Sequence, residues 1–64
     1  GGGLSDREVE ILRLAAAGRT DIEIARSLNI SKSTARFHLT NIYGKLGAAN
    51  RTEAVRIAIE HNML

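Results

Sequence analysis

Residues 20–40 read TDIEIARSLNISKSTARFHLT, and this stretch decides the fold. Its apolar residues recur at the spacing of an amphipathic helix on both sides of a short break. Thr20 and Ser31 are residue types that cap the start of a helix, and Asn29 tolerates the left-handed conformation that ends one. The stretch therefore predicts a helix at 21–28, a short turn and a second helix that begins directly after Ser31.

The corner between these two helices contains the small and apolar residues that close packing requires. Ala25 is small where the helices approach each other, and Ile30 can fill the corner with an apolar side chain. Two helices joined by a short turn form a helix-turn-helix, which we expect at about 21–40. In that motif the first helix crosses the DNA backbone and the second lies in the major groove.

The same signals recur along the rest of the chain and predict four helices. Three pairs have the spacing of a capping box, in which a small polar residue precedes a glutamate by three positions: Ser5 with Glu8, Thr20 with Glu23, and Asn50 with Glu53. The expected helix stops are Gly18, Asn29 and Gly47. The predicted helices span 6–17, 21–28, 32–46 and 51–61, which gives an all-α four-helix bundle.

The predicted core consists of apolar side chains at helical spacing on these helices. They are Ile11, Leu12, Ala15, Ile24, Ala25, Leu28, Ala35, Leu39, Ile42, Leu46, Ala54, Ile57 and Ala58. Leu4, just before the first cap, is expected to pack as a hydrophobic staple.

The length of 64 residues is enough for one small domain. We expect the three glycines at 1–3 to be a linker and the domain to occupy 4–64. The chain has no cysteine, which excludes disulfides and thiolate metal sites and fits a reducing cytoplasm. No apolar run approaches the ~20 residues that cross a bilayer, so we expect no membrane contact.

The net charge of the chain is only +2, but its positive charges are clustered. Residues 29–50 contain Lys32, Arg36 and Lys45 and no acid, whereas the segments before and after them sum to −1 and 0. Clustered positive charge is the expected footprint of phosphate binding, although a solvated basic face would have the same composition.

The outward side of the helix predicted at 32–46 carries no acid. Its residues outside the apolar stripe are Lys32, Ser33, Arg36, Phe37, Thr40, Asn41 and Gly44. A solvated helix usually mixes Glu with Lys, because such pairs stabilise it. Thr, Asn and Gly are poor choices for helix stability, but hydroxyl and amide groups can bond base edges or phosphate oxygens. The pattern therefore predicts a surface that faces DNA.

No combination of residues predicts catalysis or metal binding. The two histidines lie 23 residues apart, so we expect no metal site and a partly buried, structural His38. Glu8 and Glu23 occupy capping positions, and no nucleophile accompanies them. Their charge can also pair with Lys45 or Arg51. We therefore expect the chain not to be an enzyme and to need no cofactor.

Many residues at fixed spacing resemble a known family. The matching segments are Leu4-Ser5-Asp6-Arg7-Glu8 through Leu14, Glu23-Ile24-Ala25, Ile30-Ser31-Lys32-Ser33-Thr34, His38, Lys45-Leu46-Gly47 and Asn50-Arg51-Thr52-Glu53-Ala54. Together they resemble the LuxR-type (GerE/FixJ-like) DNA-binding domain over residues 4–59. The resemblance implies a four-helix fold in the C-terminal domain of a bacterial transcription regulator, which binds double-stranded DNA through its third helix.

By position, the resemblance implies base contacts from four residues of the third helix: Ser33, Arg36, Phe37 and Thr40. A second set is expected to contact the DNA backbone: Thr20, Lys32, Thr34, Asn41 and Lys45. Phe37 and Gly44 depart from the residues usual at their positions, so the resemblance does not carry over a target sequence.

The resemblance also implies that the last helix mediates dimerisation. The expected interface comprises Thr52, Val55, Arg56 and Ile59. We expect a weak homodimer that forms on DNA in the bacterial nucleoid, and only an indirect link to RNA polymerase. The alternative is a helical protein–protein interaction module without DNA binding, for which an exposed Phe37 would be a suitable anchor.

Overall fold

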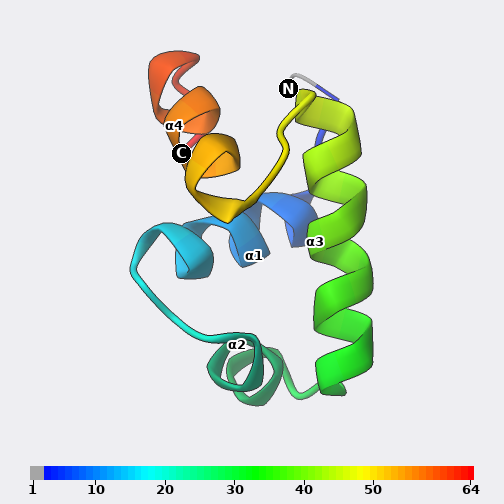
Figure 1. Ribbon diagram of the computed structural model, residues 1–64. Coiled ribbons are helices and arrows are strands. Elements are labelled where there is room, and N and C mark those ends of the chain that lie inside the picture. Colours follow the sequence, from blue (N-terminus) through cyan, green and yellow to red (C-terminus); the bar gives the residue numbers. More distant parts are fainter. Residues whose placement is uncertain (1–2) are drawn as a thin grey trace.

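The computed structural model describes residues 3–64, and its four helices confirm the predicted all-α fold. The helices are α1 (Asp6–Ala16), α2 (Asp21–Leu28), α3 (Lys32–Leu46) and α4 (Arg51–Glu60), shown in Figure 1. The predicted bounds of α2 and α3 are confirmed, and α1 and α4 each end one residue before the predicted position. Of the linker expected at 1–3, the first two glycines lie outside the described residues. None of the helices within 3–64 is long and apolar enough to cross a membrane.

Each helix begins with a side chain that accepts a hydrogen bond from the backbone N–H three residues later. The capping boxes predicted at Ser5 and Thr20 are confirmed, because Glu8 and Glu23 each accept a reciprocal bond of 2.9 Å from the capping residue. The reciprocal bond predicted for Glu53 is wrong. Its carboxylate accepts from the Ala49 N–H at 3.0 Å instead. The cap at that site is more extended (φ −160°) than the first two (φ −75° and −77°), so its own N–H points elsewhere.

All four helices end by the same device, the Schellman motif. A residue one or two positions past the end of each helix takes a left-handed conformation: Gly18 (φ 87°), Asn29 (φ 56°), Gly47 (φ 69°) and Asn62 (φ 55°). The next residue then donates its N–H to the carbonyl five residues earlier, at 2.8–3.1 Å. Three of these stops were predicted, and Asn62 was not.

The buried core matches the predicted one except at three positions. Ten of the predicted residues are buried: Ile11, Leu12, Ala15, Ile24, Ala25, Ala35, Leu39, Ile42, Ala54 and Ala58. Leu28, Leu46 and Ile57 are half-buried instead. The first two are the last residues of α2 and α3, and Ile57 lies on the flank of a helix whose buried side is centred on the two alanines. Leu4 and Ile30 are half-buried and pack against the core, as expected.

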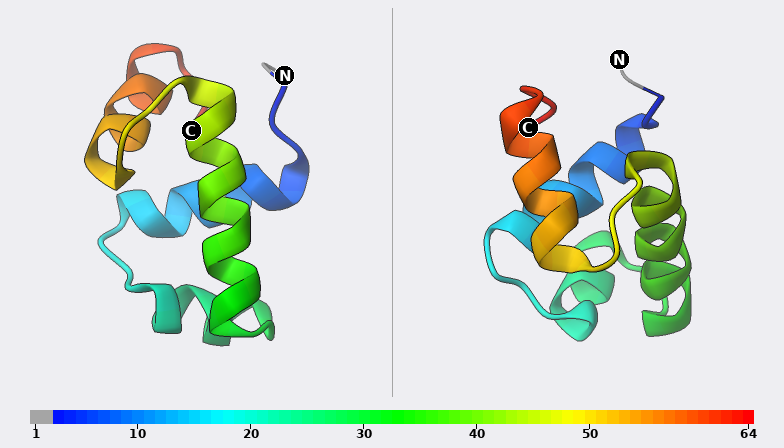
Figure 2. Two further views of the ribbon diagram at one scale, coloured as in Figure 1. Left: turned by 45° about the vertical axis from the view of Figure 1, so that its right-hand side comes forward. Right: turned by 45° about the horizontal axis from the view of Figure 1, so that its top comes forward.

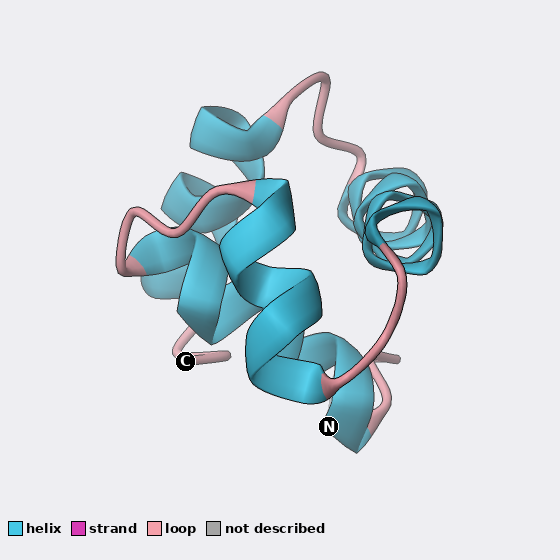
Figure 3. Cartoon of the chain, turned by 90° about the horizontal axis from the view of Figure 1, so that it is seen from below, coloured by secondary structure: helices cyan, strands magenta, loops and turns pink. Residues whose placement is uncertain are grey.

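The longest helix, α3, stands along one edge of the molecule (Figure 1). It packs against each of the other three helices. Figure 2 shows α2 across the beginning of α3 and the N-terminal segment near the opposite end. Viewed along α3, the other helices lie on one side of it and its other side is uncovered (Figure 3). The helix therefore has an inner side in the core and an outer side open to solvent.

A buried carboxylate ties α1 to the end of α3. Glu8 is only 5% exposed, and its Oε1 accepts hydrogen bonds from the Lys45 ammonium at 2.7 Å and the Ser5 backbone N–H at 2.9 Å. The bond from Lys45 and then the bond from the Ser5 backbone hold the pKa of Glu8 below its ordinary value, against the opposing effect of burial. The ionised form of Glu8 is therefore the one that stabilises the fold.

The glycines near the end of α3 should respond oppositely to substitution by alanine. Gly44 lies within the helix, where an added Cβ meets no atom within 4 Å, so Gly44→Ala should raise the free energy of unfolding by about 0.5–1 kcal/mol. An added Cβ at Gly47 also meets no atom within 4 Å, but the φ of 69° there is strained for any residue with a side chain. Gly47→Ala should therefore lower the free energy of unfolding by about 1 kcal/mol. Urea unfolding measures both values. A stabilising Gly47→Ala would contradict the left-handed helix end.

Acid should weaken the fold through Glu8. Because the folded-state pKa is depressed, this contribution is present above the ordinary glutamate value of 4.5 and is lost as pH falls through the folded pKa. Glu8→Gln should lower the free energy of unfolding by about 1–3 kcal/mol at pH 7 and make its loss in acid shallower. The control is Glu10→Gln on the same helix, whose exposed ion pair with Arg7 at 3.9 Å should contribute less than about 1 kcal/mol. Parallel acid curves for wild type and Glu8→Gln would show that Glu8 does not carry the effect.

Candidate nucleic-acid interface

The outer side of α3 is a stripe of exposed, mostly polar residues. Ser33, Phe37, Thr40 and Gly44 follow one another at spacings of 4, 3 and 4, which places them on one face of the helix. All four are exposed, and Phe37 is 63% exposed. The buried residues Ala35, Leu39 and Ile42 lie on the other face. The sequence prediction of an outward polar face that contains an exposed aromatic residue is confirmed.

The beginning of α3 is the most favourable place for a negative ligand. The other three helices each have an acid in the first turn, whereas α3 has none there and begins with Lys32. Lys32 is exposed and forms no ion pair within residues 3–64. The partial positive charge at the start of the helix and the charge of the Lys32 ammonium therefore both attract an anion to this end of α3.

Two hydroxyl groups near the stripe already form bonds within the chain. The Thr34 hydroxyl accepts from the Ser31 hydroxyl at 2.8 Å, and the Thr40 hydroxyl donates to the Arg36 carbonyl at 3.0 Å. The Thr40 oxygen keeps its capacity to accept a hydrogen bond. The Thr40 hydroxyl can therefore accept a hydrogen bond from the amino group of a base and keep its own bond to the Arg36 carbonyl.

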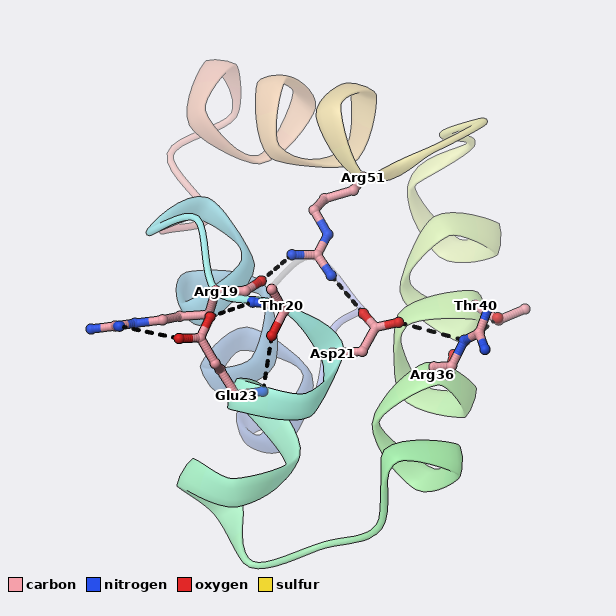
Figure 4. Close-up of polar contacts among 7 residues, drawn as sticks. All are labelled: Arg19, Thr20, Asp21, Glu23, Arg36, Thr40 and Arg51. Atoms are coloured by element: carbon pink, nitrogen blue, oxygen red, sulfur yellow. Dashed lines mark hydrogen bonds and ion pairs between the residues drawn. The ribbon is translucent and has the colours of Figure 1, made fainter.

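Arg36 lies at the border of the stripe and turns toward α2. Its Nε is 3.5 Å from the Oδ2 of Asp21, and its side chain is 66% exposed (Figure 4). The other oxygen of Asp21 accepts a 2.6 Å hydrogen bond from the Arg51 guanidinium, which also donates to the Arg19 carbonyl. One carboxylate thus holds two guanidinium groups from α3 and α4.

Sequence reasoning missed Asp21 as a member of this site. It allowed the capping glutamates Glu8 and Glu23 to pair with Lys45 or Arg51: the pair of Lys45 with Glu8 is confirmed, and within residues 3–64 neither glutamate pairs with Arg51. Glu23 is held by its bonds with Thr20 and faces Arg19 at 4.0 Å, so the carboxylate that remains for Arg51 is that of Asp21. The only available signal was an aspartate at the first position of α2, which by itself is explained by the helix dipole.

The nine residues predicted to contact DNA are all exposed. The charged residues among them do not form one continuous basic patch. Lys45 lies nine residues after Arg36, which puts the two on opposite flanks of α3. The Lys45 ammonium is bound to Glu8, so a phosphate there would have to share it. Thr20, at the cap of α2, lies beside Asp21 and so adjoins the Arg36 flank (Figure 4).

His38 lies beside the stripe and is half-buried, as expected. Its ring meets the Phe37 ring edge-on, with the centroids 6.0 Å apart. Within residues 3–64 no three His, Cys, Asp or Glu side chains are grouped as metal ligands would be. The histidine therefore supports the aromatic residue of the stripe.

The residues expected at a dimer interface have different environments in α4. Thr52 is exposed, and Arg56 pairs with Glu60 at 3.0 Å. Ile59 is 61% exposed, whereas Val55 is half-buried and packs against the core. The free apolar surface of this set is therefore centred on Ile59.

Comparison with known proteins identifies the family. Residues 3–58 match the family model GerE, bacterial regulatory proteins of the luxR family. The chain is 45% identical over 60 residues to the transcriptional activator protein ExpR of Dickeya dadantii, covering 94% of this chain and 24% of ExpR. It is 43% identical over 61 residues to the response regulator protein VraR of Staphylococcus aureus, covering 95% of this chain and 29% of VraR.

The solved structures give the same result for the fold. A crystal structure of the response regulator ChrA, from a heme-sensing two-component system, superposes with a TM-score of 0.94 at 40% identity. The match covers 97% of this chain and 31% of ChrA. The chain spans less than a third of the length of each of these relatives, and the family is one of regulatory proteins rather than enzymes. The chain belongs to the LuxR family of bacterial regulatory proteins, as a helix-turn-helix domain.

Proposed function

We propose that this domain binds double-stranded DNA sequence-specifically, with α3 in the major groove, as part of a bacterial transcription regulator. The observation that carries the proposal is the uncovered, acid-free side of α3. A helix of 15 residues is ~22 Å long and ~10–12 Å wide, and the major groove is ~12 Å wide. The family supports the proposal, since its relatives include a transcriptional activator and a response regulator.

The residues proposed to contact DNA have one of two roles. Those on the stripe or its Arg36 border read base edges: Ser33, Arg36, Phe37 and Thr40. Those at the cap of α2 and around the stripe hold the DNA backbone: Thr20, Lys32, Thr34, Asn41 and Lys45. Among the lysines, Lys32 should be the stronger phosphate contact, because its ammonium is unpaired within the described residues and that of Lys45 is bound to Glu8.

A salt titration of DNA binding tests this function. Phosphate contacts release counterions, so affinity should fall steeply as salt rises. Lys32→Ala should weaken binding to every duplex and flatten the salt slope by about one phosphate. The control is Arg13→Ala, which removes an exposed cation from α1 on the covered side of α3 and should leave the slope unchanged. Absence of salt-dependent DNA binding by the wild type would favour a protein–protein interaction module instead.

Phe37 should contribute to DNA binding and not to folding. An aromatic ring on the stripe can contact a thymine methyl group or a sugar. Because Phe37 is 63% exposed, its side chain contributes little to the stability of the fold. Phe37→Ala should therefore reduce DNA affinity about tenfold or more, as the ~1.5–3 kcal/mol for burying a Phe side chain implies, at an unchanged melting temperature. A drop of several degrees in melting temperature would instead make Phe37 a core residue.

We further propose that two copies of the chain pair through α4 on DNA. Ile59 is the exposed apolar centre of the proposed interface, with Thr52, Val55 and Arg56 around it. Such a patch is small beside the ~1,000 Å² that stable interfaces bury, so pairing should be weak without DNA. Two-fold pairing doubles the contacts on a palindromic site.

Ile59→Glu should abolish cooperative occupancy of paired half-sites. The new charges would face each other across the two-fold axis, and exposed Ile59 is not needed by the fold. A mobility-shift assay with one or two half-sites, together with thermal unfolding, measures both effects. Ile59→Ser, which shortens the side chain without a charge, should show an intermediate loss. If the Ile59→Glu variant still occupied both half-sites cooperatively, the two copies would not pair through Ile59.

A further inference from the structure

The ion-pair cluster at the start of α2 joins three parts of the chain through one carboxylate. Asp21 is the first residue of α2 and is held beside the capping box of Thr20 and Glu23 (Figure 4). Its two oxygens face different partners, Arg51 at 2.6 Å and Arg36 at 3.5 Å. Asp21 thus lies between the residue proposed to read DNA and the beginning of α4.

Arg51 fixes the position of this carboxylate. It is the first residue of α4, its side chain is 31% exposed, and it donates both to Asp21 and to the Arg19 carbonyl in the loop before α2. A guanidinium that donates to two acceptors on one segment has few other orientations. The bond from Arg51 to Oδ1 therefore holds the carboxylate of Asp21 in place. Its other oxygen, Oδ2, faces Arg36 from a fixed position.

We propose that Asp21 is a positioning residue for Arg36 and that Asp21 thereby raises the ratio of specific to non-specific DNA affinity. This inference rests on the proposed function, since it presumes that Arg36 contacts DNA. The closest contact of the ion pair is made by the Nε of Arg36, and neither Nη donates a hydrogen bond within the described residues. The two terminal nitrogens are the pair that can donate end-on to the O6 and N7 of guanine. Asp21 therefore holds the stem of the side chain while the recognising end stays available.

The charge of Asp21 supplies the second part of the effect. Non-specific binding depends on the attraction of cations to phosphates at any sequence. A carboxylate 3.5 Å from Arg36 offsets that attraction, and it competes with any phosphate that would draw the side chain away. A bidentate contact to guanine needs only the free end of the guanidinium. Asp21 should therefore weaken non-specific binding more than specific binding.

The central experiment compares two duplexes. A target is first selected by the wild-type chain from duplexes with a randomised central segment, and affinity is measured for that target and for a scrambled duplex over a salt series. Asp21→Asn should bind the scrambled duplex about threefold more tightly, with a salt slope steeper by about one, and its specificity ratio should fall about tenfold. Asp6→Asn is the matched control, because Asp6 is also the first residue of its helix and forms no ion pair within 3–64. Its ratio should stay at the wild-type value.

A double-mutant cycle separates positioning from general charge. In the wild-type background, Arg36→Ala should reduce affinity for the target more than for the scrambled duplex. In the Asp21→Asn background, Arg36→Ala should reduce both about equally, because the released side chain contacts phosphates indiscriminately. An Arg36→Ala effect that is the same in both backgrounds would overturn the proposal.

A measurement on the wild type does not depend on whether Asp21→Asn folds. The Nε–H bond of Arg36 should have a higher NMR order parameter than that of Arg13, which forms no ion pair within the described residues. Equal order parameters would overturn the proposal. If the wild type selects no sequence, the proposed function fails and this inference with it. If it selects a target and Asp21→Asn keeps the wild-type ratio, only the role of Asp21 is wrong.

Discussion

The turn between α2 and α3 is the constraint on which the rest of the structure depends. Asn29 takes the left-handed conformation, and the Ile30 N–H then donates to the Ala25 carbonyl at 2.9 Å. The same step turns the Ile30 side chain against the core. The direction of α3 relative to α2 is set by these local bonds, because so short a turn has no other freedom. Only with this direction does the first residue of α2, Asp21, come within reach of Arg36 on α3.

The two ends of α3 are tied down on opposite flanks, and the polar stripe lies between the ties. On one flank Arg36 meets Asp21, and on the other Lys45 meets the buried Glu8. One tie links α3 to the start of α2 and the other links it to α1, so the ties add to the apolar packing in resisting rotation of the helix about its axis. A helix that reads base edges must present one face reproducibly, since a small rotation moves every side chain off its base. In the proposed function, the ion pairs therefore support recognition without occupying the stripe.

The features that depend on neighbouring residues could be predicted from the sequence. Helix starts and stops follow from caps and from left-handed Gly or Asn, and the exposure of Phe37 follows from helical spacing. The partner of Arg51 could not be predicted, because Arg51 and Asp21 are 30 positions apart and each had several possible partners. Ile57 was expected to be buried, but the buried side of α4 is centred on Ala54 and Ala58, which leaves Ile57 half-buried on the flank.

A cluster of cations in the sequence is not the same as a basic surface in the fold. Of the three cations that give residues 29–50 their positive charge, Lys45 is bound to Glu8 and Arg36 shares Asp21 with Arg51. Only Lys32 keeps its charge unpaired within the described residues, at the positive end of the helix dipole. The attraction of a single domain for arbitrary DNA should accordingly be modest. In the proposed function, tight binding then comes from contacts that only the right sequence offers and from pairing of two copies, and both conditions favour occupancy of a specific site over the rest of a genome.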